Sequence, residues 1–310
     1  MIDRIKDYIE NNTESKVLVD ELMKNHTTYG IGGPVDLFVL PSNKEDLINV
    51  FKISKKYNQE VNVVGSGSNL LVSDHGIRGV VICIKNCLNN LDVQDNKIYA
   101  ECGVMLGKLV KHSIKNNLKG LENLIGVPGT LGGALIMNAG AWGGEISNCL
   151  ESVELIDPDK DEIVTLSKSK INFSYRSSSF KNESILLSAL FHMDYSDKKI
   201  IEDSSKIAQF GRKDTQPLKY RSAGSVFKNP SKEKPAGMLI DKAGLKGLTI
   251  GDAQISEKHA NFFINKKNAK ANDMLNLIKK AKNTVKEKFD VDMNLEVKLM
   301  GFEEGEIDSL

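Results

Sequence analysis

The sequence lacks any apolar run of the roughly 20 residues that a membrane-spanning helix needs. Residues 1–12 also lack the apolar core of a signal peptide, because isoleucines are interspersed there with charged residues in an amphipathic helix pattern. The 42 lysines and arginines nearly balance the 41 acidic residues, so the formal net charge is +1. This balance gives no electrostatic reason to expect nucleic acid or an anionic membrane as a partner. We therefore expect a cytoplasmic protein that binds neither.

Cysteine is also scarce, and its four occurrences stand apart from one another. Cys83 and Cys87 lack the Cys-x-x-Cys spacing of many zinc sites, and no histidine–cysteine cluster accompanies them. Cys102 and Cys149 each stand alone among apolar residues. We expect reduced thiols in the core of a cytosolic protein, with neither a disulfide framework nor a bound metal.

The chain of 310 residues is long for a single hydrophobic core, so two or three subdomains are expected. Residues 1–78 read as a compact strand–helix–strand–turn–strand unit. Residues 79–213 carry short strands with a hairpin around residues 157–160, residues 214–303 carry a strand and a long helix, and residues 304–310 form a tail. Strands and helices mixed in this way, without regular alternation, predict an α+β fold.

Local signals predict where several elements begin and end. Ser42 and Glu45 have the spacing of a capping box and predict the start of a helix. A later helix, beginning near Leu106, is expected to end near Gly120, because glycine readily adopts the left-handed C-terminal conformation. A last strand is expected over residues 294–300.

A first glycine-rich segment, residues 65–69 (Gly-Ser-Gly-Ser-Asn), directly follows an apolar strand over residues 61–64. A Rossmann dinucleotide motif would need a third glycine and a following helix, whereas residues 70–72 (Leu-Leu-Val) read as a strand. We therefore reject the Rossmann interpretation. A turn whose backbone N–H groups converge on an anion is one remaining interpretation. A tight turn between two strands, without a ligand, is the other.

Further glycine-rich patches occupy residues 126–134 with 138–144, and residues 30–34. Glycine costs backbone entropy on folding, so a dense cluster inside a folded domain needs a reason. Backbone that lies against a flat or charged ligand is one reason, and a set of bulges and tight turns without a ligand is another. Three patches suit a large cofactor, such as a dinucleotide with a planar ring system.

Taken in order, residues 27–33 (TTYGIGG), 65–71 (GSGSNLL) and 126–133 (GVPGTLGG) resemble the FAD-binding elements of the UDP-N-acetylenolpyruvoylglucosamine reductase (MurB) family. The resemblance runs from residue 20 to residue 302. It implies the FAD-binding fold of the vanillyl-alcohol-oxidase and p-cresol-methylhydroxylase type, followed by a C-terminal α+β substrate domain.

The resemblance also implies noncovalently bound FAD, with NADPH as co-substrate. Residues 1–78 and 79–213 would form two FAD-binding subdomains, and residues 214–303 the substrate-binding domain. The pyrophosphate would lie on the first glycine-rich turn, where Ser68 stands instead of the histidine that attaches FAD covalently in some relatives of the wider fold. The implied cofactor-binding residues are Gly65, Ser66, Gly67, Ser68, Asn69, Gly126, Pro128, Gly129, Thr130, Gly132, Gly133, Asn138 and Gly140.

Three polar residues match the family's catalytic set: Arg176, Ser225 and Glu296. Taken alone, each has an ordinary alternative as a surface charge, a turn residue or a solvent-facing strand residue. The resemblance implies reduction of UDP-N-acetylglucosamine enolpyruvate to UDP-N-acetylmuramate for peptidoglycan synthesis, with a hydride from the reduced flavin to C3 and a proton from Ser225 to C2. Arg176 would stabilise the negative charge that develops on the substrate carboxylate, and Glu296 would share a hydrogen bond or a proton with it.

Lys228, Asn229 and Lys258 are candidate substrate-binding residues suited to a diphosphate or sugar, with solvated surface positions as the alternative. The short spacing between Arg176 and Ser225 resembles the compact branch of the family, which lacks a tyrosine-bearing loop. Arg221 stands where we expect proline in compact-branch relatives. It either adds a phosphate contact or has no functional role.

Two other functions fit part of this pattern. Another flavin oxidoreductase of the same fold, such as a carbohydrate oxidase, would share the glycine-rich turns but not the ordered set of Arg176, Ser225 and Glu296. A nucleotide-sugar-binding module without redox activity would carry no flavin. A P-loop transferase is excluded, because the sequence has no GxxxxGK[ST] motif. The oligomeric state and the preference between NADPH and NADH stay open.

Overall fold

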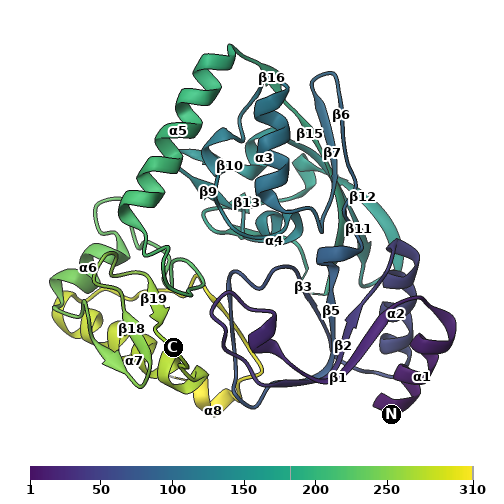
Figure 1. Cartoon of the computed structure of the whole chain (residues 1–310), viewed down its shortest axis with the longest axis horizontal. Helices are drawn as coiled ribbons and strands as arrows, with labels where there is room; N and C mark the ends of the chain where they lie inside the picture. The colour runs from purple at the N-terminus through teal and green to yellow at the C-terminus, as the bar shows by residue number, and fades with distance from the viewer. Residues whose placement is uncertain (182, 309–310) are drawn as a thin grey trace. The chain divides into compact units, whose positions relative to one another are not determined.

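The computed structural model describes residues 1–181 and 183–308, so the end of the predicted tail, residues 309–310, lies outside the described residues. The chain divides into two compact units. Unit 1 comprises residues 1–19, 37–66 and 79–212, and unit 2 comprises residues 20–36, 67–78 and 213–310. Each unit contains both helices and strands (Figure 1), which confirms the predicted α+β class.

Among the described residues, unit 1 contains five α-helices and two main sheets. The helices are α1 (Ile2–Asn12), α2 (Lys44–Lys56), α3 (Leu106–Lys115), α4 (Leu131–Ile136) and α5 (Lys198–Thr215), the last three residues of which belong to unit 2. The first sheet, with strand order β1-β2-β5-β3, is formed by β1 (Lys16–Leu22), β2 (Pro34–Leu40), β5 (Ile77–Cys83) and β3 (Val61–Val64). The division between the units falls within β1, β2 and β5. Strand β3 runs parallel to β5, and α1 packs against α2 (Figure 1).

Helix α2 begins at a different cap from the predicted one. Asn43 precedes the helix with extended backbone, and its side-chain oxygen accepts a hydrogen bond from Asp46 N at 2.9 Å. The hydroxyl of Ser42 donates instead to Glu14 O at 2.7 Å. The predicted Ser42–Glu45 capping box is therefore wrong, because asparagine is an equally good N-cap and lies one residue closer to the helix.

The second sheet of unit 1 is antiparallel, with strand order β12-β11-β15-β7-β6. Its strands are β12 (Glu162–Ser167), β11 (Leu150–Asp157), β15 (Ile185–His192), β7 (Lys97–Glu101) and β6 (Leu91–Gln94). Strands β11 and β12 form the predicted hairpin. Short antiparallel pairs are formed by β8 (Leu118–Lys119) with β16 (Asp194–Tyr195), β9 (Gly140–Ala141) with β10 (Gly144–Glu145), and β13 (Phe173–Ser174) with β14 (Ser177–Ser178).

Helix α3 ends earlier than predicted. Its last residue is Lys115, and Asn117 follows in the left-handed conformation with φ of 58°. Gly120 lies beyond the short strand β8 and does not cap the helix. The predicted end near Gly120 is therefore wrong, because asparagine also tolerates the left-handed conformation and comes first along the chain.

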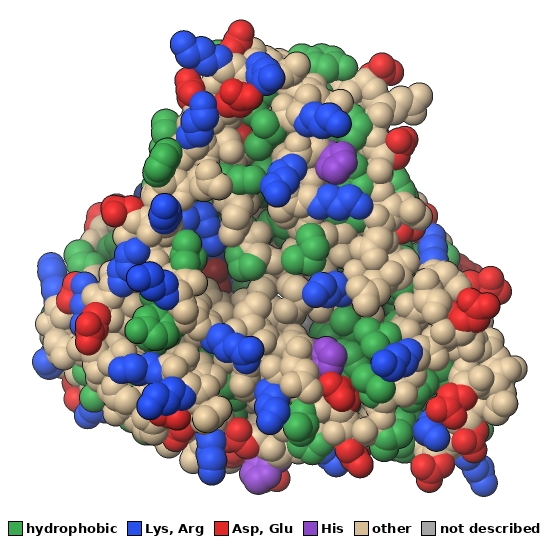
Figure 2. All heavy atoms as spheres, viewed as in Figure 1, with side chains coloured by type: hydrophobic (Ala, Val, Ile, Leu, Met, Phe, Trp, Pro, Cys, Tyr) green, Lys and Arg blue, Asp and Glu red, His purple; other side chains and the backbone are tan. Residues whose placement is uncertain are grey.

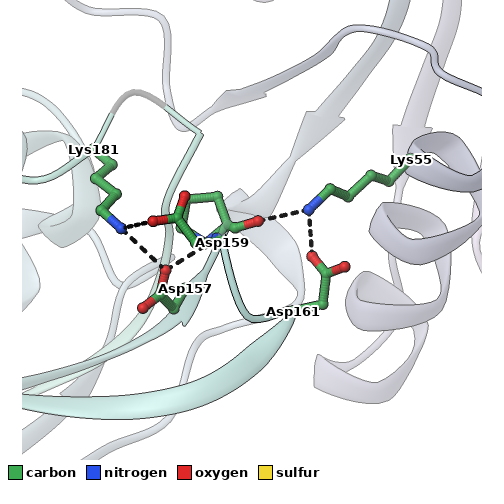
Figure 3. A network of polar contacts seen from close by, with 6 residues as sticks. Lys55, Asp157, Asp159, Asp161 and Lys181 are labelled. Carbon is green, nitrogen blue, oxygen red and sulfur yellow. Dashed lines mark hydrogen bonds and ion pairs between the residues drawn. The ribbon is translucent and has the colours of Figure 1, made fainter.

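An exposed ion-pair network joins α2 to the β11–β12 hairpin (Figure 3). Lys55 Nζ donates to Asp161 Oδ1 at 2.5 Å, while Lys181 pairs with both Asp157 and Asp159. The Asp159 N–H, followed by the Lys181 ammonium, lowers the pKa of Asp157. Because most of these side chains are exposed, the network adds little to stability and is weakened by salt.

Unit 2 is built around one long helix. Its helices are α6 (Ala236–Lys242), α7 (Ala271–Phe289) and α8 (Glu304–Ile307). Its strands are β17 (Thr249–Ile250), β18 (Ala253–Ile255) and β19 (Phe263–Asn265), which form one sheet, and β4 (Leu70–Val72) with β20 (Lys298–Met300), which pair in parallel. Helix α7 packs against α6, β17 and β18, and its apolar face is buried at Met274, Leu277, Ile278, Ala281 and Val285.

The last strand is shorter than predicted. Strand β20 covers only residues 298–300 of the expected 294–300. Leu295 forms a single antiparallel bridge with Phe227, and the following residue hydrogen-bonds to Val226. Residues 294–296 therefore pair with a different segment from the one beside β20, which interrupts the strand.

Charges of both signs occur on the face drawn in Figure 2. Within residues 1–181 and 183–308, no helix is long and apolar enough to cross a membrane. The same residues contain no group of three or more histidine, cysteine, aspartate and glutamate side chains placed to hold a metal ion. The four cysteines are free thiols, and burial raises the pKa of Cys87 to about 12.

Replacing Leu277 by Ala should destabilise the protein, because the side chain is fully buried in the core of unit 2. Loss of its methyl groups and the cavity left behind cost about 2–5 kcal/mol at such sites. Urea denaturation followed by circular dichroism measures the change. Lys280→Ala, at an exposed position of the same helix, is the control and should change the free energy of unfolding by less than about 0.5 kcal/mol.

Candidate active site

Two of the predicted cofactor-binding segments meet at Gly65 in unit 1. A Cβ built on Gly65 would lie 2.1 Å from Thr130 Oγ1 and 2.9 Å from Thr130 Cγ2. The Thr130 side chain therefore occupies the space that any larger residue at position 65 would need. The glycine turn after β3 and the segment that enters α4 are in direct contact, as two parts of one binding surface would be.

Two of the predicted cofactor-binding residues each carry a buried polar atom with no hydrogen-bond partner among the described residues. These atoms are Ser66 Oγ and Asn138 Oδ1. Buried polar groups are nearly always hydrogen-bonded, so each such atom needs an explanation. A dinucleotide carries hydroxyl, phosphate and ring N–H groups that can satisfy both. The residues present therefore fit the predicted cofactor.

Asn138 and Gly140 bring the predicted flavin-binding segment to Arg176, also in unit 1. Asn138 is fully buried, and its amide donates to Glu145 Oε2 at 2.9 Å and to Ser174 O at 3.1 Å. A Cβ built on Gly140 would lie 3.2 Å from Arg176 Nη1. The structure thus places Asn138, Gly140 and Arg176, all selected from the sequence, close to one another.

Arg176 lies in the turn of the β13–β14 hairpin. Its φ is 54°, which is the left-handed region, and its guanidinium lies over the Tyr175 ring at 5.2 Å from the ring centroid. Ser178 Oγ donates to Ile136 O at 2.7 Å, which fastens the hairpin to the end of α4. The hairpin therefore presents the arginine from a fixed support.

Ser225 and Glu296 come together through the backbone of unit 2. Ser225 bridges Phe262, and Glu296 N donates to Val226 O at 2.8 Å. The Asn261 side chain binds the backbone of Phe227, two residues after the serine: it accepts from Phe227 N at 3.0 Å and donates to Phe227 O at 2.8 Å. The segment that carries the serine is therefore fixed between the segments that contain Phe262 and Glu296.

The remaining residues of the glycine turn, Gly67–Asn69, belong to unit 2. Asn69 Nδ2 donates to Glu296 O at 3.0 Å, so a predicted cofactor residue contacts the backbone of a predicted catalytic one. A Cβ built on Gly67 would lie 2.1 Å from His26 O, and Thr28 N donates to Gly67 O at 3.1 Å. This part of the turn thus packs on the start of the glycine-rich segment over residues 27–33.

The structure gives the predicted substrate-binding residues local contacts. Lys258 Nζ donates to Lys213 O at 2.7 Å, near the end of α5. Asn229 Oδ1 accepts from Ala236 N at 3.1 Å, at the first residue of α6. Lys228 is half-buried, and its backbone N donates to Asn294 O at 2.8 Å. Their roles in binding substrate stay predictions.

Arg221, which stands where proline was expected, packs on the glycine-rich patch over residues 30–34. A Cβ built on Gly30 would lie 2.0 Å from Arg221 Nη1, and Arg221 bridges Asn265 through its backbone. The absence of a side chain at Gly30 is therefore what makes room for the guanidinium. The structure gives Arg221 a packing role within unit 2, and its contact with a phosphate stays open.

Two charged residues near the predicted flavin-binding segment were not selected from the sequence. Glu145 is the side-chain partner of Asn138, and Arg212 packs its Nε 3.3 Å from a Cβ built on Gly126. Burial lowers the pKa of Arg212. Glu145 directly follows the Gly143-Gly144 pair, which is the one local signal that could have marked it, whereas Arg212 sits in an ordinary helical pattern.

Comparison with known proteins gives the family. The chain is 47% identical over 301 residues to UDP-N-acetylenolpyruvoylglucosamine reductase of Clostridium tetani, covering 96% of this chain and 97% of the relative. The chain belongs to the UDP-N-acetylenolpyruvoylglucosamine reductase family. The corresponding protein of Clostridium novyi is 44% identical, with 96% and 94% of the two chains covered.

Family models and a solved structure agree with this assignment. Residues 216–300 match the C-terminal domain of UDP-N-acetylenolpyruvoylglucosamine reductase, and residues 35–167 match an FAD binding domain. The crystal structure of the reductase from Thermus caldophilus superposes with a TM-score of 0.77 at 32% identity, covering 93% of this chain and 99% of that one. The predicted family, the flavoprotein fold and FAD as cofactor are confirmed.

Replacing Gly65 by Ala should weaken FAD binding in this reductase, because the new methyl group would overlap the Thr130 side chain. We expect the purified variant to retain less flavin, measured as the ratio of visible to ultraviolet absorbance, and to bind added FAD at least about tenfold more weakly. Gly107→Ala is the control, because nothing lies within 4 Å of a Cβ built there. Equal flavin content in both variants would contradict the assignment of this turn to the cofactor.

Proposed function

We propose that this chain catalyses the NADPH-dependent reduction of UDP-N-acetylglucosamine enolpyruvate to UDP-N-acetylmuramate in peptidoglycan precursor synthesis, acting in the cytoplasm. The observation that carries the proposal is the 47% identity to a reductase of this name over 96% of the chain. Both the FAD binding domain and the family's C-terminal domain lie within that match. The glycine turn after β3 and the segments around α4 would hold FAD, which would supply the redox chemistry between NADPH and the enolpyruvyl group.

Arg176 acts on the substrate carboxylate. Reduction at C3 leaves negative charge at C2, and that charge spreads onto the adjacent carboxylate. A guanidinium is always charged and presents a planar fork that matches a carboxylate. Charge fixed in place before the reaction stabilises the transition state more than charge that must reorganise. The support of its hairpin by Asn138 and Ser178 suits Arg176 to this role.

Ser225 and Glu296 complete the reaction. The Ser225 hydroxyl donates the proton that C2 needs, and Glu296 shares a hydrogen bond or a proton with the carboxylate. A hydroxyl is a weak acid, so it can serve as a proton donor only to a strongly basic centre and only when well placed. Asn261, which holds the adjacent backbone at Phe227, supports that placement.

FAD is bound noncovalently, since the glycine turn carries Ser68 and no histidine. Lys228, Asn229 and Lys258 contribute to the site of the UDP diphosphate and sugar. Of these, Lys258 would have to exchange its hydrogen bond to Lys213 O for one to a phosphate oxygen. The Asn229 side chain already accepts a hydrogen bond from the first residue of α6. It therefore supports the site by holding this helix in place rather than by contacting the ligand.

Replacing Ser225 by Ala separates the two half-reactions. Flavin reduction by NADPH should stay within about twofold of the wild-type rate, whereas reoxidation by the enolpyruvyl substrate should slow by at least about 10²-fold, the usual contribution of a positioned proton donor. Anaerobic stopped-flow absorbance measures both. Ser222→Ala, in the same segment, is the matched control. Equal loss in both half-reactions would contradict the role assigned to Ser225.

A further inference from the structure

Glu145 lies beside Arg176, across a glycine that makes room for both side chains. In the β9–β10 pair, Glu145 is directly opposite Gly140. A Cβ built on Gly140 would lie 3.0 Å from Glu145 Cγ and 3.2 Å from Arg176 Nη1. The acidic side chain and the guanidinium therefore approach the same point from two different hairpins of unit 1.

Asn138 ties Glu145 to the hairpin that carries Arg176. Its amide group donates one hydrogen bond to Glu145 Oε2 and another to Ser174 O, two residues before the arginine. Both partners are acceptors, so the orientation of this amide is determined by its surroundings. Asn138 is fully buried in the left-handed conformation, with φ of 41°, which asparagine tolerates better than other residues with a side chain. The carboxylate is thus held at a fixed position relative to the arginine turn.

We propose that Glu145 is a positioning residue for Arg176: its carboxylate lies beside the guanidinium and, by charge attraction, favours the orientation that meets the substrate carboxylate. This inference rests on the role proposed above for Arg176. An arginine side chain has many rotamers, so each contact that orders it before substrate binds lowers the entropy cost of binding. A guanidinium has five N–H groups, so one edge can pair with Glu145 while another binds the substrate. Pre-orientation then raises the rate of the step in which charge develops on the substrate.

The first test is Glu145→Gln, which removes the charge and keeps an acceptor for the Asn138 amide. Flavin reduction by NADPH should stay within about twofold of wild type, while reoxidation by the enolpyruvyl substrate should slow about tenfold. Glu145→Asp, which keeps the charge, should recover part of that loss. The control is Glu162→Gln, an exposed position on β12 of the same unit, which should change neither rate.

A purely structural role for Glu145 would affect the stability of the protein and its binding of FAD, and not only the second half-reaction. In that case Glu145→Gln would lower the melting temperature and the affinity for FAD and would slow both half-reactions, which would overturn the inference. Unchanged affinity for FAD, measured by fluorescence titration of the apoprotein, together with loss in the second half-reaction alone, would support it.

A double-mutant cycle with Arg176→Ala separates this inference from the function on which it rests. If the two residues act as a unit, Glu145→Gln should have almost no further effect on reoxidation when Arg176 is already alanine. Independent effects that multiply would overturn the positioning role while leaving that of Arg176 intact. Normal reoxidation in Arg176→Ala itself would instead overturn the role of Arg176, and the positioning role with it.

Discussion

Close approach of side chains to backbone at two glycines is the constraint on which the candidate site in unit 1 depends. Gly65 leaves space for the Thr130 side chain, and Gly140 leaves space for those of Glu145 and Arg176. An added methyl group would overlap the Thr130 side chain at Gly65, and at Gly140 it would press against Glu145 and Arg176 at 3.0–3.2 Å. These two glycines thus have a packing reason beyond turn formation, and at Gly140 side chains from two hairpins approach the same point.

In unit 2 the corresponding constraint is a set of backbone hydrogen bonds. The segment around Ser225 is too short to form a regular strand, yet it bridges Phe262 on one side and is bonded to the Glu296 segment on the other. The buried Asn261 side chain forms hydrogen bonds with both the N–H and the C=O of Phe227, as a neighbouring strand would. Polar contacts of this kind determine the position of a serine more narrowly than apolar packing alone, because each has a required direction.

Much of the fold could be predicted from the sequence where the pattern is long and periodic. The repeated apolar positions of α7 identify that helix correctly, because one of its faces is buried. The apolar runs on either side of the turn at residues 157–160 identify the β11–β12 hairpin. Element ends were predicted less well, since Asn43 and Asn117 compete as caps with Ser42 and Gly120. The shortened last strand follows from pairing between residues far apart in sequence, which no local pattern reveals.

For the site, motifs identified the segments but not their mutual contacts. Asn138 and Gly140 were selected as cofactor residues and Arg176 as a catalytic one, and only the fold shows that they are neighbours. Glu145 escaped selection because an acidic residue after two glycines looks like an ordinary turn. Its significance comes from the register of a hairpin of two-residue strands, which is set by tertiary packing and not by propensity.

The most direct measurement of the central claim is an anaerobic titration of the wild-type protein, followed by the visible absorbance of its flavin. NADPH should bleach the absorbance band, and UDP-N-acetylglucosamine enolpyruvate added afterwards should restore it without oxygen. Bleaching that only oxygen reverses would contradict the account and favour an oxidase. A protein with no visible band even after incubation with FAD would contradict it as well, leaving a nucleotide-sugar-binding module without redox activity.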